Sequence, residues 1–441
     1  MPLNTSKYIL IALIAVIIIG ACGYYYYTTT LPKKITLKLH LRAGVWVDHV
    51  TKSGVLKKFH DRMLKEKNLD VKVEIVTSPF EGYSSKLISA LAAGEAGDVI
   101  WLPNKLITDV VEAGYIIDLT SYLEKWPSWD KVYKPAKEEV TYKGKFWNTP
   151  YEYNCRTIIY YRKDLLKKAG IPIPWQPKTL DDLIKTTLTI KEKIPEIKVP
   201  ILPRWYEEHV VYAFGGRIYD PAENKWVVKS DAILNCFKYY YDLFYTYKVC
   251  PREAILEKWD KRELFRRGEE AILVDGIWAW GEMFGPGKAY EIPNREEIVG
   301  YAYFPGSGKP GTPKFVNIAA GGAGYAITSA CKNPDLAWEL IKDLVAPEIC
   351  STWCISTSHP VARADCAIGE YAKDPFMMWA TAYVKDYGVA RPQVYGISKY
   401  RNDFKKAMSE LIGTGISPEE AMEKFASMVS KDVGAENVKE E

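Results

Sequence analysis

The stretch that decides the fold runs from Ile35 to Trp101 and reads ITLKLHLRAGVWVDHVTKSGVLKKFHDRMLKEKNLDVKVEIVTSPFEGYSSKLISALAAGEAGDVIW. Leucine and β-branched residues predict three strands, at Ile35–Leu41, Val71–Val76 and Asp98–Trp101. Apolar residues at helical spacing predict two helices between them, over Gly54–Lys67 and Tyr83–Ala93. Strands that alternate with helices in this way indicate right-handed crossovers and a parallel sheet.

Ligands of such sheets bind beyond the carboxyl ends of the strands. The residues that follow the three strands are therefore the first candidates for a binding site, at 45–48, 78–83 and 102–105. They include Trp46, Tyr83 and Asn104 as candidate ligand contacts. A core position is the alternative for Trp46, and burial is expected for Trp101, which lies on a strand.

Length and composition limit the class of protein. The 441 residues, with 59 Lys and Arg against 55 Asp and Glu and a net charge of +4, predict two or three compact units and make a nucleic-acid partner improbable. There are 31 Tyr and 14 Trp against only 13 Phe. Aromatic rings with a polar group suit a wet surface that grips a ligand.

Residues 1–33 are interpreted as a signal or anchor segment with a short linker. An apolar run, Tyr8 to Ala21, precedes Cys22 and four consecutive tyrosines. One interpretation is a lipobox-like site at which Cys22 is lipidated. The others are a retained transmembrane anchor, with the tyrosines as an interfacial aromatic belt, and simple secretion. All three export the rest of the chain.

Cysteine spacing indicates disulfides rather than a metal site. If Cys22 carries a lipid, seven cysteines remain, and an odd number leaves at least one thiol free. One disulfide is expected among Cys350, Cys354 and Cys366, and Cys236 with Cys250 offers another. No pair has zinc spacing with histidine partners, so neither a metal nor a cofactor is expected.

Further motifs are spread along the chain in a constant order. They are YSSKL at 83–87, LAAGEAGDVIW at 91–101, EAGY at 112–115, YYRKDL at 160–165, DGIWAW at 275–280 and KNPDLAW at 332–338. In these motifs the chain resembles family 1 of the extracellular solute-binding proteins, the sugar-type, maltose-binding-protein-like receptors of ABC importers. The resemblance covers roughly Ile35 to Val429. The tyrosine-rich N-terminus and the cysteines at 350 and 354 depart from it.

The resemblance implies an α/β fold of two lobes, the periplasmic-binding-protein-like fold of class II, which closes by a hinge around its ligand. Lobe 1 is expected to take residues 34–150 and 305–346. Lobe 2 is expected to take 151–304 and 347–441. Local composition agrees with crossings near Pro150, Phe304 and Ala346.

A sugar offers apolar faces and a rim of hydroxyls, so its site needs flat aromatic rings and planar polar side chains. The resemblance identifies Trp278 as the stacking tryptophan, and Trp280 is expected to pack in the core. It also implies ligand contacts from Tyr151 and Asn154 and a further platform at Trp205. Gly321 and Gly322 allow close backbone approach, and a lid contact is expected from Tyr395 or Arg391. A core role for Trp278 and a solvated hinge at 151–156 are the alternatives.

The predicted function is an extracellular, membrane-anchored and monomeric receptor that captures a sugar or oligosaccharide and delivers it to ABC permease subunits. No catalytic motif is present, because the adjacent carboxylates of Asp181 and Asp182 are typical of a solvated helix end. The alternatives are a surface glycoside hydrolase or a receptor for ferric iron, a polyamine or a similar solute. Tyr160 and Tyr161 would supply phenolates for iron, but neighbours on a strand point to opposite faces.

Overall fold

The computed structural model describes residues 14, 16, 18, 31–203, 208–318 and 322–441. The fold is mixed α/β and divides into two compact units. Unit 1 comprises Met1–Ile100 and Ala330–Leu344, and unit 2 comprises Trp101–Ser329 and Val345–Glu441. The passage after Leu344 lies close to the crossing expected at Ala346. Pro150 and Phe304 both lie inside unit 2, and the lobe boundaries stay a prediction.

Unit 1 is built on parallel strands, as the sequence predicts. Its elements are β1 (Lys33–Arg42), α2 (Val45–Lys52), α3 (Val55–Lys67), β2 (Leu69–Ser78), α4 (Tyr83–Ala92), the start of β3 (Val99–Pro103) and α15 (Pro334–Leu344). β1 pairs in parallel with β2 along its whole length, and it pairs in parallel with β3 at Leu39 and His40. The expected strands and helices are thus confirmed. The residues after β1, which the sequence names as binding candidates, form the helix α2.

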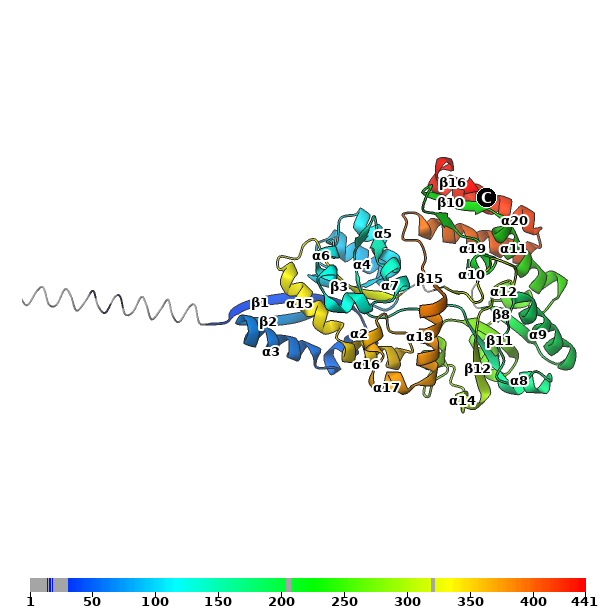
Figure 1. The fold of residues 1–441 in the computed structure, drawn as a ribbon, viewed down its shortest axis with the longest axis horizontal. Helices are drawn as coiled ribbons and strands as arrows, with labels where there is room; N and C mark the ends of the chain where they lie inside the picture. Colours follow the sequence, from blue (N-terminus) through cyan, green and yellow to red (C-terminus); the bar gives the residue numbers. More distant parts are fainter. Residues whose placement is uncertain (1–13, 15, 17, 19–30, 204–207, 319–321) are drawn as a thin grey trace, which may run out of the picture. The chain divides into compact units, whose positions relative to one another are not determined.

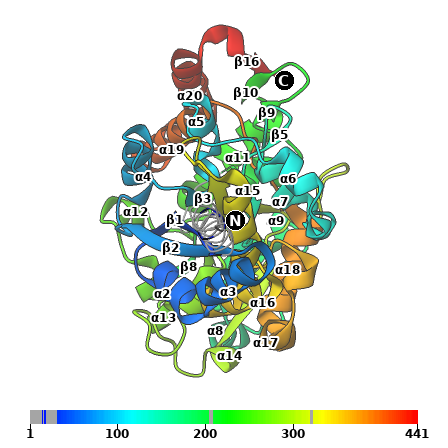
Figure 2. The same ribbon diagram turned by 90° about the vertical axis from the view of Figure 1, so that its left-hand side faces the viewer.

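Helix α3 buries one face and packs against β2, as Figures 1 and 2 both show. It begins after Gly54, and its buried side chains are Val55, Phe59 and Met63. These residues recur every four positions, the spacing that forms an apolar stripe on a helix. α15 packs against α3.

Arg62 joins α3 to α15 through charge-assisted hydrogen bonds. Its guanidinium donates from Nη1 to Glu339 Oε2 at 2.8 Å and from Nη2 to Asp343 Oδ2 at 3.0 Å. Lys342 Nζ also lies 3.0 Å from Glu339 Oε2. Burial acts to raise the pKa of Glu339, but the hydrogen bonds from Arg62 and Lys342 outweigh it and hold the pKa at about 2.

Unit 2 contains the remaining strands, most of which form small sheets. They are β4 (Thr141–Tyr142), β5 (Lys145–Phe146), β6 (Thr149–Pro150), β7 (Ile158–Arg162), β8 (Val199–Pro203), β9 (Tyr219–Asp220), β10 (Lys225–Lys229), β11 (Glu270–Asp275), β12 (Val299–Tyr303), β13 (Asn317–Ile318), β14 (Ala323–Ile327), β15 (Gly388–Val389) and β16 (Val438–Glu440). The central sheet has the order β12-β7-β11-β8, with β8 and β11 parallel and both fully buried.

Helices surround these sheets. The α-helices of unit 2 are α5 (Ile107–Glu112), α6 (Thr120–Glu124), α7 (Lys134–Glu139), α8 (Lys163–Lys168), α9 (Leu180–Lys193), α10 (His209–Ala213), α11 (Asp231–Tyr241), α12 (Glu253–Leu256), α13 (Lys261–Arg267), α14 (Arg295–Ile298), α16 (Pro347–Thr357), α17 (Gly369–Lys373), α18 (Pro375–Tyr387), α19 (Ile397–Thr414) and α20 (Pro418–Val433). Short helical turns are η1 (Asn104–Leu106), η2 (Pro127–Lys131), η3 (Asp242–Thr246), η4 (Ala279–Met283), η5 (Ala364–Cys366) and η6 (Ala435–Asn437).

The C-terminal helices of unit 2 complete a large apolar core. α20 packs against both α19 and α11, and Figure 1 shows α19 and α20 beside β10 and β16. Phe237, Phe404 and Phe425 meet at the centre, where Phe237 and Phe404 stack with centroids 5.4 Å apart. Burial of such rings contributes about 2 kcal/mol each.

Most of the expected N-terminal anchor lies outside the described residues, and Cys22 is among the residues that are not described. Within the described part of the chain, every helix is too short or too polar to cross a bilayer.

Replacing Glu339 with Gln should cost about 1–2 kcal/mol of unfolding free energy at pH 7. The carboxylate's pKa falls from 4.5 to about 2 on folding, which corresponds to about 3.4 kcal/mol before solvent screening of this partly exposed group reduces it. A folded pKa below the unfolded one stabilises above pH 4.5, and this contribution disappears as the pH falls towards 2. The variant should therefore lose less stability than the wild type on acidification across this window. Urea titrations followed by circular dichroism measure both effects.

The matched control is Glu66→Gln, because Glu66 faces the same Arg62 Nη1 at 3.5 Å but its side chain is 53% exposed. An exposed pair contributes little, so this variant should behave as the wild type. Equal losses in the two variants would contradict the assignment to Glu339.

Candidate ligand-binding site

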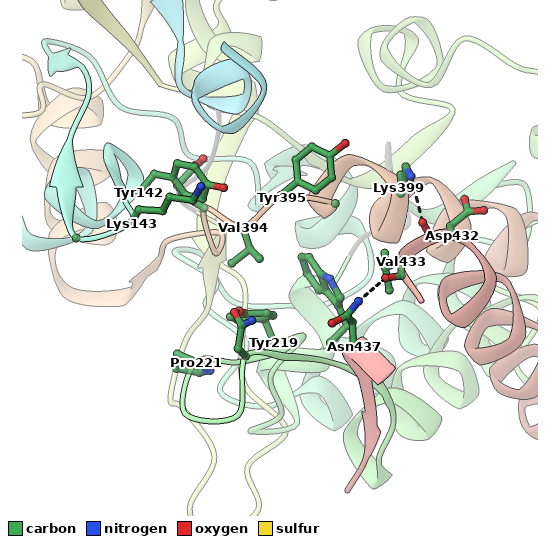
Figure 3. Close-up of a pocket in the computed structure, with 15 residues that line it drawn as sticks. Tyr142, Lys143, Tyr219, Pro221, Val394, Tyr395, Lys399, Asp432, Val433 and Asn437 are labelled. Carbon is green, nitrogen blue, oxygen red and sulfur yellow. Dashed lines mark hydrogen bonds between the residues drawn. The ribbon is translucent and has the colours of Figure 1, made fainter. Parts of the chain in front are cut away.

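A cavity of about 690 Å³ lies within unit 2, and Figure 3 shows the side chains around it. We call it the tyrosine cavity. Its wall includes Tyr142, Tyr219, Trp226, Gln393, Tyr395 and Asn437. In Figure 3 Tyr142 lies on the opposite side from Lys399 and Asp432. The volume is in the range of small-molecule sites in proteins.

Tight turns bring these side chains to the cavity. The β4–β5 turn has left-handed backbone at Lys143 and Gly144, with φ of 51° and 71°. This conformation closes a two-residue hairpin and holds Tyr142 at its base. Gly396 precedes α19 with φ of 96°, and an added Cβ would lie 3.4 Å from Val433 Cγ1. Glycine is therefore the residue that this position accommodates.

Aromatic rings fix one wall of the cavity. Trp226 stacks on Tyr400 with centroids 4.9 Å apart, and Tyr219 meets Trp226 edge to face at 5.0 Å. Trp226 is buried, whereas the Tyr395 side chain is 60% exposed. The wall thus combines a rigid ring pair with an accessible phenol.

The polar side chains of the cavity differ in whether they form hydrogen bonds within the protein. Tyr219 hydrogen-bonds to Asn224 Oδ1, Asn437 Nδ2 donates to Val433 O at 2.7 Å, and Lys399 Nζ donates to Asp432 O at 3.1 Å. The half-buried amide of Gln393 has no hydrogen-bond partner among the described residues. Gln393 therefore offers both a donor and an acceptor to a ligand.

The phenols of Tyr142 and Tyr219 stay protonated. Burial raises the pKa of Tyr142, and its hydrogen bond to Glu112, 2.6 Å long, raises it further. Burial and the nearby Asp220 carboxylate raise the pKa of Tyr219. Neutral hydroxyls of this kind both donate and accept hydrogen bonds.

Trp278, the stacking candidate from the sequence, is half-buried in a second group of residues. Its ring lies parallel to that of His359, with centroids 6.3 Å apart, and Arg156 Cζ lies 5.7 Å from its centroid. Burial lowers the pKa of His359 to about 4, so its imidazole is neutral at pH 7. We call Trp278, His359 and Arg156 the Trp278 cluster.

In the turn that carries Trp278, only glycine fits at position 276. A Cβ on Gly276 would lie 2.3 Å from the indole, which folds back over this glycine. Gly276 N donates to Asp275 Oδ1 at 2.7 Å, and Ile277 N donates to Cys155 O at 2.8 Å. These bonds place the 276–278 turn beside the 154–156 segment.

Three other predicted residues lie together in the interior of unit 2. Asn104 is fully buried, donates to Glu139 Oε2 and accepts from Asn148 Nδ2, each at 2.8 Å. Its backbone N–H bonds to Gly322 O, and a Cβ on Gly322 would lie 2.7 Å from Glu152 O. Tyr151 is also buried.

The Tyr151 phenol accepts a hydrogen bond from Trp101 Nε1 at 3.0 Å, and its ring stacks on Tyr325. Burial raises its pKa well above 10. Asn154 is buried as well. The expected burial of Trp101 is confirmed, and so is that of Trp280, which stacks on Phe376. Of these residues, Asn104 and Tyr151 have their polar atoms engaged by the protein.

The predicted residues of unit 1 lie at the carboxyl ends of its strands. Trp46, in α2, is half-buried, and Arg42 Cζ lies 4.5 Å from its ring and 3.5 Å from that of Phe80. Tyr83 is buried and meets His40 edge to face at 6.1 Å. Phe80 was not predicted, although it follows β2 and is 57% exposed.

Tyr395 is thus the predicted residue that lines the tyrosine cavity. Trp205 and Gly321 lie outside the described residues. Tyr142, Tyr219, Trp226 and Gln393 were missed. The first three lie on the short strands β4, β9 and β10, and Gln393 lies in a segment without regular periodicity. The paired phenolates needed by the iron alternative do not meet: Tyr160 hydroxyl donates to Gly276 O at 3.1 Å, and Tyr161 hydroxyl accepts from Trp175 N.

The chain is similar to proteins whose names state the ligand that they bind. The chain is 23% identical over 276 residues to the maltotriose-binding protein of Pyrococcus abyssi, a match that covers 61% of this chain and 55% of that protein. The chain therefore spans about half the length of this relative. It is also 23% identical to the galactooligosaccharide-binding protein of Bacillus subtilis, over 77% of this chain and 75% of that one.

Among solved structures, the sugar-binding protein MalE of Xanthomonas citri superposes with a TM-score of 0.75 at 18% identity. The superposition covers 90% of this chain and 98% of that chain. The fold is therefore the two-lobed α/β fold of the maltose-binding proteins, as the resemblance implied. The family model of the bacterial extracellular solute-binding proteins matches residues 50–349, more than half of the chain, and the chain belongs to that family.

Proposed function

We propose that this protein is the extracellular sugar receptor of an ABC importer. It binds a sugar or oligosaccharide in the tyrosine cavity, with Trp278 as a further stacking ring, and delivers it unchanged to the permease subunits. Maltotriose and galactooligosaccharide, the ligands named for the two relatives, indicate the class of sugar. The receptor acts as a monomer.

One observation carries the proposal. The half-buried Gln393 amide has no hydrogen-bond partner in the described part of the chain, and it lines a cavity walled by Tyr142, Tyr219 and Trp226. A sugar hydroxyl matches such an amide, because it donates and accepts at one atom. The C–H faces of the same sugar ring match the aromatic wall.

The N-terminal segment completes the proposal. Residues 1–33 tether the receptor to the outer face of the membrane, through a lipid on Cys22 or through a retained helix. A tethered receptor has a raised effective concentration at its permease.

Binding is tested by thermal shift against mono- and oligosaccharides, with maltotriose first. A ligand that binds only the folded state adds about 2.7 kcal/mol at a concentration of 100 times its Kd. The midpoint should therefore rise with maltotriose concentration, and chromatography should recover the sugar intact. Shortened products would support the hydrolase alternative instead. No shift with any sugar would refute the proposal.

Gln393→Leu should weaken sugar binding about fivefold, because it removes a neutral hydrogen bond of about 1 kcal/mol. The midpoint of the unliganded protein should not fall, because this amide makes no hydrogen bond to any residue that the structure describes. Tyr395→Ala should weaken binding in the same way. Calorimetry measures both, with Leu256→Ala as control, since Leu256 is 57% exposed in α12 outside the cavity. Unchanged affinity in both cavity variants would show that the sugar does not bind in the tyrosine cavity.

Trp278→Ala should weaken sugar binding about tenfold, the loss expected when a stacked ring worth roughly 1.5 kcal/mol is removed. Trp259→Ala is the matched control. This half-buried indole donates to Glu257 at 2.8 Å and lies outside both groups of candidate residues. If Gln393→Leu weakens sugar binding but Trp278→Ala does not, the ligand lies in the tyrosine cavity alone.

Deletion of residues 1–33 should release the receptor from the membrane fraction into the soluble fraction. Cys22→Ala should do the same if the tether is a lipid, and it should leave the protein in the membrane if the apolar helix is retained. Fractionation followed by immunoblotting distinguishes these results. Recovery of the intact full-length chain in the soluble fraction would contradict tethering.

A further inference from the structure

Cys350 and Cys366 lie against each other in the interior of unit 2. Both are fully buried, and α16, which carries Cys350, packs against η5, which ends at Cys366. The interaction with the neighbouring Cys350 thiol, together with burial, raises the pKa of Cys366. Ser351 Oγ donates to Ile368 O at 2.7 Å, which fixes the helix to the segment that follows the second cysteine.

Arg363 holds the surroundings of both thiols in place. Its Nη1 donates to Val345 O at 2.8 Å, and the Cys350 thiol donates to the same oxygen at 3.4 Å. Its Nε donates to Asp365 Oδ1 at 3.0 Å, the atom that accepts from the Cys366 thiol at 3.6 Å. Each thiol therefore shares an acceptor with one buried guanidinium.

We propose that Cys350 and Cys366 form a disulfide bond in the exported protein. The seven described cysteines are free thiols in this structure, but the family acts outside the cell, where disulfides persist. The two thiols lose two protons and two electrons as the S–S bond forms. A disulfide oxidant such as oxidised glutathione accepts the electrons and becomes two thiols. Because both sulfurs are buried, exchange occurs while the chain folds.

Cys354, one helical turn after Cys350, is directed elsewhere. Its thiol donates to Tyr151 O at 3.8 Å and to Pro360 O at 3.9 Å. Arg363 shares an acceptor with Cys350 and another with Cys366, whereas the acceptors of Cys354 are different ones, and this favours the pairing of Cys350 with Cys366.

The bond would close a ring that includes part of the Trp278 cluster. The enclosed segment carries His359, which lies parallel to Trp278, and Pro360, whose carbonyl accepts from Tyr153 N at 2.8 Å. Closing such a loop restricts the unfolded chain and stabilises the folded one. The disulfide would thus hold His359 at the candidate stacking ring.

Peptide mapping tests the pairing. The full chain, purified without reductant, is unfolded, alkylated with iodoacetamide and digested with trypsin. Cleavage after Arg363 separates the peptide of Cys366 from the peptide that carries Cys350 and Cys354. We expect these two peptides linked, with Cys354 alkylated in the fragmentation spectrum. Reduction should lower the thermal midpoint by a few degrees.

Two variants control the assignment. Cys354→Ser should keep the linked peptides, whereas Cys350→Ser should abolish them. Complete alkylation of all seven thiols after refolding with oxidised glutathione would overturn the proposal, and so would a bond from Cys354. The mapping needs no sugar, so its outcome is independent of whether the proposed ligand binds.

Discussion

The buried ion pair between Arg262 and Asp275 fixes the point at which β11 ends. Arg262 Nε donates to Asp275 Oδ2 at 2.7 Å, and both side chains are almost fully buried. Removing one partner of such a pair typically costs about 3–5 kcal/mol, because the other charge stays buried. Asp275 also accepts from Gly276 N, so the pair sets the turn that carries Trp278. The candidate stacking ring thus depends on a charge pair behind it.

Tyrosine serves the interior of this protein as well as its cavity. The buried Tyr383 hydroxyl donates to Val316 O at 2.5 Å and accepts from Phe304 N at 2.8 Å. Phenylalanine would fill the same space but would leave that backbone N–H without its partner, at a cost of about 1–3 kcal/mol. The excess of Tyr over Phe therefore arises partly because buried backbone groups need a tyrosine hydroxyl as their hydrogen-bond partner. Composition indicates a gripping surface but does not locate it.

Sequence reasoning was most successful where periodicity is strong. The parallel strands of unit 1 and α15 follow from patterns that burial imposes on sheets and helices. It failed where position depends on tertiary contacts: Trp226 reads as an ordinary strand residue, and its place at a cavity depends on Tyr400, far along the chain. Gln393 has no motif at all. Its significance comes from half-burial without a partner, which a sequence does not record.

The contrast between Asn104 and Gln393 shows why burial alone does not identify a ligand contact. Both are amides in unit 2, but Asn104 already bonds to Glu139 and Asn148. A sugar would have to break these bonds, and each broken bond costs as much as the new one contributes. Among the described residues Gln393 has no hydrogen-bond partner, so a sugar hydroxyl binds its amide without breaking a bond in the described part of the protein. The free energy of binding therefore favours the amide that the fold leaves unsatisfied.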